Sequence, residues 1–240
     1  MNLLRPIAST VVWAMVAVSC LGQALAAPQA DRTNPFCSYR NYHYVIPIFL
    51  SGQVVSSVKA IPGRITDTER KRIGKLSRLE IGRDELGRHN LYVPLNQAGE
   101  SYGVMRVHSE PGDYGLVFVA ILLDKDLRIH RYKLLQYRGK AKEWMSKNVA
   151  LHTRIQGADS STLRSWLDKK GTSLSAKGIK TLGLEGEADR NLRSVIHVLR
   201  ISIKVIYSTD LGWGPRLRKN NWIRARKPQS TESPPSPARD

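Results

Sequence analysis

Cysteine is scarce in this chain of 240 residues, which contains only Cys20 and Cys37. Because Cys20 lies in a predicted leader segment, the mature chain is expected to keep Cys37 alone, which excludes an intramolecular disulfide. A lone cysteine is most often a buried small hydrophobic residue, although a free thiol or a link to another chain stays open for Cys37. The folded part must therefore be held together by packing.

The sequence patterns of catalysis and metal binding are also missing. The six histidines are dispersed, without HExxH or HxxxH spacing and without a cysteine pair nearby, so a metal site is not expected. The chain has no GxSxG nucleophile elbow and no glycine-rich phosphate loop of the GxxxxGK[ST] or GxGxxG type. Asp124 and Asp126 are better explained by a turn than by an acid–base pair. The sequence therefore contains none of these catalytic patterns.

The first 27 residues have the pattern of a secretory signal peptide. A short positive region with Arg5 precedes an apolar run, and Ala24–Ala27 forms a small-residue cleavage site. The apolar run is shorter than the roughly 20 residues that span a bilayer, so cleavage is favoured over a transmembrane anchor. A lipid anchor on Cys20 is less favoured, because Ala17 stands where a larger aliphatic residue is usual. We therefore expect a periplasmic or secreted protein.

Basic residues outnumber acidic residues by 38 to 20, which gives a formal net charge of +18. An exported protein of this charge could bind an acidic protein or an anionic surface. Nucleic acid is not an expected partner, because an exported protein seldom meets it. The positive charge is spread over most of the chain, so a solvated basic surface without a specific partner carries at least equal weight.

The hydrophobic pattern predicts a single α+β domain over residues 28–208. Its centre is Tyr102–Arg138, where three β-like runs are separated by short turns, so we expect an antiparallel β-meander packed with a few helices. Thr66–Glu69 has the capping-box pattern of a helix start, and this helix should run to about Leu79. Residues 209–240 are basic and end in a Pro- and Ser-containing stretch, which predicts a disordered tail.

Four other segments have less regular patterns. Residues 39–58 are crowded with aromatic and branched side chains, which predicts one or two short strands. Residues 91–95 contain a proline and are expected to form an edge strand. Residues 171–186 are rich in Gly, Ser and Lys and predict an exposed loop. Residues 192–207 begin with helical spacing and then alternate apolar with polar side chains, so a helix that turns into an extended segment is expected.

Several segments occur in the order known from one family of flavoproteins, namely Thr66–Ile73, Leu91–Val93, Ser101–Val104, Val117–Asp126 and Tyr132–Arg138. In these segments the chain resembles the FMN-binding domain family of exported electron-transfer subunits, which includes periplasmic domains of membrane redox complexes. The resemblance implies an electron-transfer or accessory module that works beside a membrane redox partner and has no substrate of its own.

The resemblance also implies where a flavin would bind. The family attaches FMN to the threonine of a Ser-Gly-Ala-Thr-x-Ser/Thr motif, whereas the best placed counterpart here, Glu185–Asn191, has no threonine. Gly139 also replaces the glutamate that commonly follows the family's Tyr-Arg pair. The implied cofactor is therefore a non-covalent FMN, with its ring system against the meander and its phosphate near Gly186 or Arg190. The implied cofactor-binding residues are Tyr137, Arg138, Gly186, Ala188, Arg190 and Asn191.

An alternative is a related fold that has lost its flavin. Glu185, Glu187 and Asp189 would repel a phosphate, and the attachment threonine is missing. In that case the protein would be a basic binding module for an acidic protein or an anionic surface. Tyr137 and Arg138 would then be no more than the end of a strand.

Overall fold

The computed structural model describes residues 42–85, 87–113, 115–138 and 140–224. The predicted signal peptide, both cysteines and residue 139 lie outside the described residues. Among the residues described, no helix has the length and apolar character needed to cross a membrane. The periplasmic or secreted location stays a prediction.

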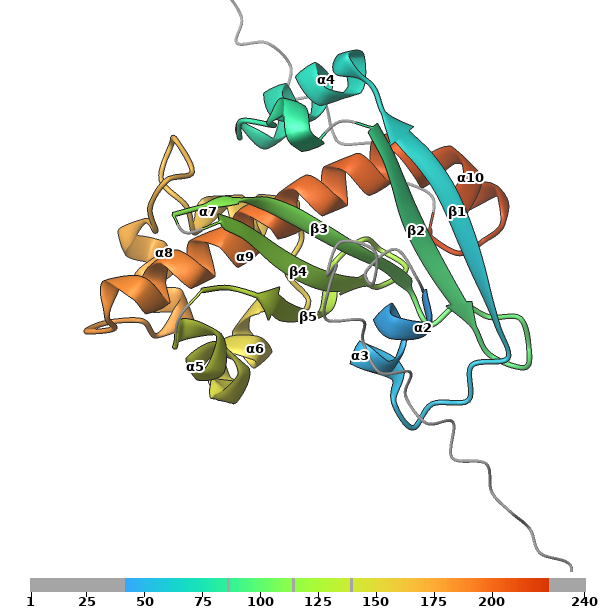
Figure 1. Ribbon diagram of the computed structural model, residues 1–240, viewed down its shortest axis with the longest axis horizontal. Helices are drawn as coiled ribbons and strands as arrows, with labels where there is room; N and C mark the ends of the chain where they lie inside the picture. The colour runs from blue at the N-terminus through green and yellow to red at the C-terminus, as the bar shows by residue number, and fades with distance from the viewer. Residues whose placement is uncertain (1–41, 86, 114, 139, 225–240) are drawn as a thin grey trace, which may run out of the picture.

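A five-stranded antiparallel sheet forms the centre of the fold, with its strands in sequence order (Figure 1). Its strands are β1 (Ser57–Ile65), β2 (Gly87–Leu95), β3 (Val104–Gly112), β4 (Gly115–Leu123) and β5 (Ile129–Gln136). The predicted meander corresponds to β3, β4 and β5, and the predicted α+β class is confirmed. β4 is buried from Val117 to Leu123, as its continuous apolar run indicates.

The sheet is weakly joined between β2 and β3, which pair only at Tyr92 and Met105. β2 was predicted to be an edge strand because of Pro94, yet it lies between β1 and β3. The carbonyl of Pro94 accepts a hydrogen bond from the Tyr102 amide, so its nitrogen also faces the β3 side. The proline is tolerated because the regular β2–β3 ladder does not extend to this position.

A single long helix, α9 (Asp189–Ser208), crosses one face of the sheet (Figure 1). The predicted change to an extended segment within residues 192–207 is wrong. Ser202 and Lys204, which suggested a polar face of a strand, are themselves buried. In the second half of α9 the side chains are buried on nearly all sides of the helix. Buried and exposed residues therefore do not alternate with the 3.6-residue period by which a helix is recognised, and the sequence pattern was misleading.

The opposite face of the sheet is covered by two short helices, α2 (Tyr42–Val45) and α3 (Pro47–Leu50). The prediction of strands is wrong for residues 42–50, and among the described residues of the predicted region only Ser57 and Val58 belong to a strand, β1. Pro47 stands at the first position of α3, where its missing N–H costs nothing. Phe49 and Leu50 are buried in a cluster with Met105, Ala120 and Leu122 of the sheet.

The other helices lie around the edges of the sheet. α4 (Asp67–Ser77) begins with the predicted capping box, in which the Glu69 amide donates to the Thr66 hydroxyl and the Thr66 amide donates to the Glu69 carboxylate. The remaining elements are η1 (Arg83–Glu85), α5 (Ala141–Lys147), α6 (Val149–Ile155), α7 (Ser160–Ser165) and α8 (Ala176–Leu182). α8 falls within the segment predicted to be an exposed loop; its start is capped by the Ser175 hydroxyl, which accepts from the Gly178 amide.

The folded domain extends past residue 208, where the predicted domain ends and the predicted tail follows. Residues Thr209–Trp213 form a π-helical segment, η2, and Gly214–Lys219 form α10. Trp213 is buried, its ring nitrogen donates to the Ile61 carbonyl at 3.0 Å, and its ring covers Gly63 so closely that a β-carbon there would lie 2.3 Å from it. This part of the basic C-terminal region therefore belongs to the core, whereas residues 225–240 lie outside the described residues.

We predict that Trp213→Ala lowers the free energy of unfolding by about 3–5 kcal/mol, because it removes a buried ring and opens a cavity beside β1. Trp222→Ala is the matched control, since Trp222 belongs to the same C-terminal region and is only partly buried. Urea unfolding of both variants measures the difference. Equal losses for the two variants would contradict a special role of Trp213.

Candidate functional site

A cavity of about 330 Å³ lies at the end of the β3–β4 hairpin and is called here the hairpin pocket. Its lining residues are Gly112, Asp113, Gly115, Leu116, Val117, Gln136, Tyr137 and Arg138. Gly112 is required by packing, because a β-carbon at this position would lie 2.7 Å from the Val117 side chain. Two of the six residues implied to bind FMN, Tyr137 and Arg138, thus line a real cavity.

The start of α9 lies beside the hairpin pocket. Arg193 on the second turn of α9 forms an ion pair at 2.9 Å with Asp113 of the pocket and a longer one at 3.7 Å with Asp189. The ring centroids of Tyr137 and His197 are 6.1 Å apart. The structure therefore brings the predicted strand end and the predicted helix start to the same end of the molecule.

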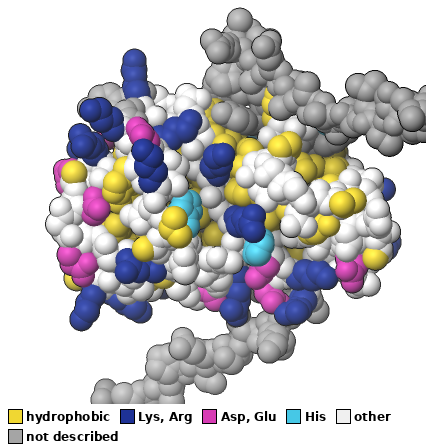
Figure 2. All heavy atoms as spheres, turned by 90° about the horizontal axis from the view of Figure 1, so that it is seen from below, with side chains coloured by type: hydrophobic (Ala, Val, Ile, Leu, Met, Phe, Trp, Pro, Cys, Tyr) yellow, Lys and Arg dark blue, Asp and Glu magenta, His cyan; other side chains and the backbone are white. Residues whose placement is uncertain are grey.

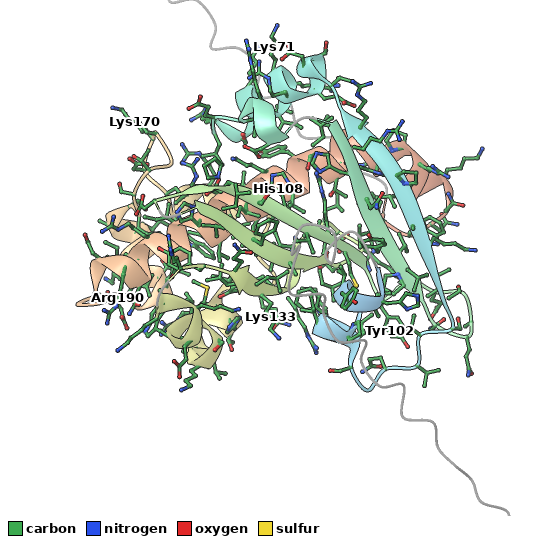
Figure 3. The ribbon with its side chains drawn as sticks, in the orientation of Figure 1. Lys71, Tyr102, His108, Lys133, Lys170 and Arg190 are labelled. Carbon is green, nitrogen blue, oxygen red and sulfur yellow. The ribbon has the colours of Figure 1, made fainter. Side chains whose placement is uncertain are left out.

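The other four predicted residues do not line the hairpin pocket. Gly186 and Ala188 are exposed in the connection that leads into α9, and Arg190 projects at the end of the molecule (Figure 3). Asn191 is buried, and its side-chain amide donates to the Glu187 carboxylate at 2.8 Å. Asn191 therefore has a structural role at the start of the helix.

Acidic residues set the charge at the start of α9. The Arg193 guanidinium is already shared between Asp113 and Asp189, so it has little positive charge left for a ligand. Within the described part of the chain, Arg138 and Arg190 form no ion pair, and of the two only Arg138 lines the pocket. A ligand phosphate is accordingly better placed at Arg138 than at the end of α9.

A buried network of charged side chains joins β3 to α9 behind the hairpin pocket. The Lys204 ammonium donates to Glu85 at 2.7 Å and to Glu110 at 3.0 Å, and all three side chains are almost fully buried. Glu110 is also paired with Nδ1 of His197 at 2.6 Å and with Nε of Arg200 at 3.1 Å. The network extends from the core to the half-buried His197 next to Tyr137.

The titration behaviour of Glu85 follows from its surroundings. Burial raises the pKa of this carboxyl, but the hydrogen bond with His108 and the charge of Lys204 outweigh burial and lower it to about 2. Burial is the largest influence on His108 and lowers its pKa, so we assign His108 as neutral, with Nε2–H donating to Glu85 at 2.7 Å. An ionised carboxylate is thus held by one neutral and one charged donor.

Arg106 continues the row of polar side chains on β3. It donates to the Ser208 hydroxyl and lies with its guanidinium carbon 4.9 Å from the centre of the Trp213 ring. Arg106, His108 and Glu110 alternate along β3, so all three face α9. This alternation is visible in the sequence, but their partners, Glu85 of η1 and residues of α9, are too far along the chain to have been inferred from it.

A second cavity of about 420 Å³ lies on the outer side of β5 and is called here the β5 cleft. It is enclosed by β5, by α5 and α6, and by the end of α3. None of the residues implied to bind FMN lines it. Among the described residues, no group of three or more His, Cys, Asp or Glu side chains is placed to hold a metal ion.

No known protein family, no curated protein and no solved structure matches this chain. The FMN-binding resemblance therefore rests on the sequence segments alone and stays a prediction.

We predict that the protein loses stability as the pH falls from roughly 6.5 to 4, the window set by His89. Burial, assisted by the charge of Arg106, lowers the pKa of His89 to about 4 from its ordinary 6.5. The unfolded state therefore binds a proton in this window that the folded state does not, and the loss should be about 2 kcal/mol for this partly exposed group. His108, whose pKa is also lowered, acts in the same direction.

Urea unfolding at a series of pH values measures this effect. His89→Gln should flatten the curve between pH 6.5 and 4, because the titrating group is gone. His130→Gln is the control, since His130 lines the β5 cleft and is not among the groups around His89, Arg106 and His108. An unchanged slope in His89→Gln would show that other groups govern the acid sensitivity.

Proposed function

We propose that the protein is an exported module that binds FMN non-covalently and serves a membrane redox partner as an electron carrier or accessory domain. The observation that carries the proposal is the hairpin pocket, which places Tyr137 and Arg138 beside the start of α9. These are the two parts of the chain that the family resemblance assigns to the flavin.

The residues of the pocket can hold a planar anionic ligand. Gly112 and Gly115 form a wall without side chains, Tyr137 offers an aromatic face, and Arg138 offers a guanidinium for a phosphate. Asp113 is held by Arg193 and so is partly neutralised. The flavin itself would supply the redox chemistry, while the protein would bind it and tune its potential.

Titration of FMN into the purified mature protein tests the proposal. We expect quenching of flavin fluorescence and a shift of the visible spectrum, because ring stacking on Tyr137 changes the surroundings of the flavin. Tyr137→Ala and Arg138→Glu should each weaken FMN binding by about tenfold or more, the effect of losing one good contact. Far-ultraviolet circular dichroism checks that the variants are folded.

Arg216→Glu is the matched control for Arg138→Glu. Arg216 is an exposed arginine on α10, at the opposite end of α9 from the hairpin pocket (Figure 1). Affinity for FMN should be unchanged in this variant. A wild-type protein that neither quenches FMN fluorescence nor shifts the FMN spectrum would exclude the flavin function. If Arg138→Glu and Arg216→Glu weakened FMN binding equally, the binding would be non-specific attraction of an anion.

A second candidate function is a basic binding module for an acidic protein or an anionic surface. The net charge of +18 supports it, and the acidic residues at the start of α9 would repel a phosphate there. Lys and Arg side chains are scattered over the face seen in Figure 2, with apolar surface between them. A surface of this kind can attract a polyanion without a preformed pocket.

For this second function we predict binding to vesicles that contain phosphatidylglycerol, with an affinity that falls steeply between low and physiological salt, because exposed charges are screened within about 8–10 Å. Co-sedimentation over a salt series measures it, and vesicles of phosphatidylcholine alone are the control. Salt-independent binding, or none at low salt, would exclude the basic module.

A further inference from the structure

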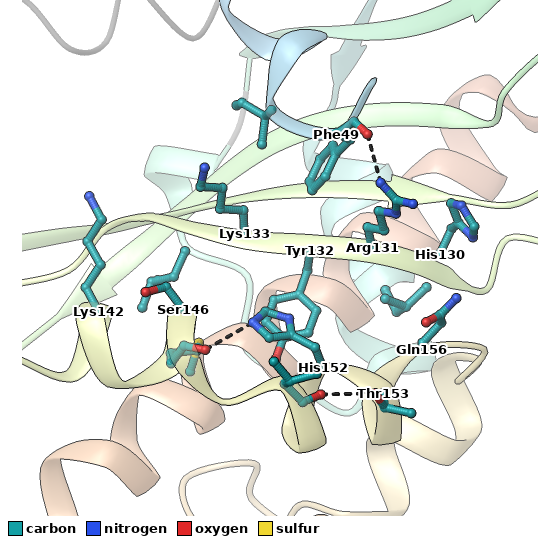
Figure 4. Close-up of a pocket in the computed structure, with 15 residues that line it drawn as sticks. Phe49, His130, Arg131, Tyr132, Lys133, Lys142, Ser146, His152, Thr153 and Gln156 are labelled. Atoms are coloured by element: carbon teal, nitrogen blue, oxygen red, sulfur yellow. Dashed lines mark hydrogen bonds between the residues drawn. The ribbon is translucent and has the colours of Figure 1, made fainter. Parts of the chain in front are cut away.

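The β5 cleft has a strongly one-sided charge. Arg131, Lys133 and Lys142 line it, together with His130 and His152, and no Asp or Glu is among its lining residues. In the close-up, Lys133 on β5 and Lys142 on α5 project from neighbouring elements on the same side of the cleft (Figure 4). Within the described residues neither lysine has an ion pair, so their charges are available to a ligand.

Apolar side chains form another part of the cleft, whose remaining lining includes the polar residues Ser146, Thr153 and Gln156. Phe49 of α3, Leu134 of β5 and Met145 of α5 are buried and contribute to its wall, and Val149 at the start of α6 is 73% exposed. Val149 extends the apolar wall of the cleft to the surface of the molecule. The cleft therefore offers apolar contact next to positive charge.

Side-chain contacts hold the elements around the cleft, β5, α3, α5 and α6, in place. The Arg131 guanidinium donates to the Phe49 carbonyl at 3.0 Å, which ties β5 to α3. The His152 ring stacks on Tyr132 with centroids 4.5 Å apart and is hydrogen bonded to the Met145 carbonyl at 3.0 Å, which joins β5, α5 and α6 (Figure 4). Arg131 is thus engaged in the fold, which leaves Lys133 and Lys142 as the cations for a ligand.

The cleft also contains an unsatisfied polar group. Tyr132 lines it and is 5% exposed, and its hydroxyl has no hydrogen-bond partner in the described part of the protein. A buried hydroxyl without a partner is unfavourable. This hydroxyl is enclosed by the protein, so it is a local cost in the wall of the cleft and is not counted as a contact for the ligand.

From this combination we propose that the β5 cleft binds an amphiphilic anion, a carboxylate or phosphate headgroup attached to an unbranched alkyl chain. The headgroup is held by Lys133 and Lys142, and the chain lies against Phe49, Met145 and Val149. A free mineral anion would leave the apolar wall uncovered, and a neutral alkyl chain would leave the two ammonium groups without a partner. The site is separate from the hairpin pocket and does not depend on flavin binding.

Isothermal titration calorimetry with monomeric decanoate and with decyl phosphate tests the proposal, and the tighter of the two identifies the headgroup. Decanol and inorganic phosphate each carry one half of the ligand, and both should bind at least about tenfold more weakly. Lys133→Glu and Lys142→Glu should each weaken decanoate binding by about tenfold or more, and Val149→Glu should do the same through the alkyl chain. All three side chains are exposed, so these variants should fold.

Two control variants keep the result specific. Lys170→Glu makes the same charge change on a loop far from the cleft (Figure 3) and should leave decanoate affinity unchanged. Arg138→Glu, which should impair FMN binding, should also leave it unchanged, so failure of one site is distinguishable from failure of the other. The proposal is overturned if neither decanoate nor decyl phosphate binds at millimolar concentration, if decanol binds as tightly as the better of the two, or if Lys170→Glu weakens binding as much as Lys133→Glu.

Discussion

The packing of α9 on the sheet depends on the contact of Lys204 with Glu85 and Glu110. Two carboxylates and an ammonium group are removed from water here, and their desolvation is compensated only because each has several partners. Without Lys204, the two buried carboxylates would be left without their shared cation. The register of α9 against β3 is therefore fixed by charge as well as by shape, and this register places His197 and Arg193 beside the hairpin pocket.

Local sequence patterns correctly predicted the elements whose structure depends on residues that are close in the chain. The capping box of α4 depends on residues three positions apart, and the strands of the meander are joined by short turns. α9 was misread after its middle, because Ser202 and Lys204 look like the polar face of a strand unless their burial is known. Likewise, the core position of Trp213 depends on β1, about 150 residues earlier in the chain.

The candidate sites also differ in whether the sequence could predict them. Tyr137 and Arg138 were inferred from the family resemblance, in which a Tyr-Arg pair follows the last strand of the meander, and they do line a cavity. The charged network was missed because Glu85 and Lys204 are 119 positions apart, and no local pattern links them. The β5 cleft was missed for a related reason, since four separate elements contribute its wall and its basic residues stand among many others in a basic chain.

The excess of positive charge has different roles in different parts of the molecule. Arg106, Arg200 and Lys204 are committed to the interior, where carboxylates, a hydroxyl or an aromatic ring hold them. Lys133 and Lys142 have no such partner in the described residues and border apolar surface. A net charge therefore does not by itself identify a binding surface, whereas the position of Lys133 and Lys142 beside apolar side chains is the feature on which the proposed ligand site rests.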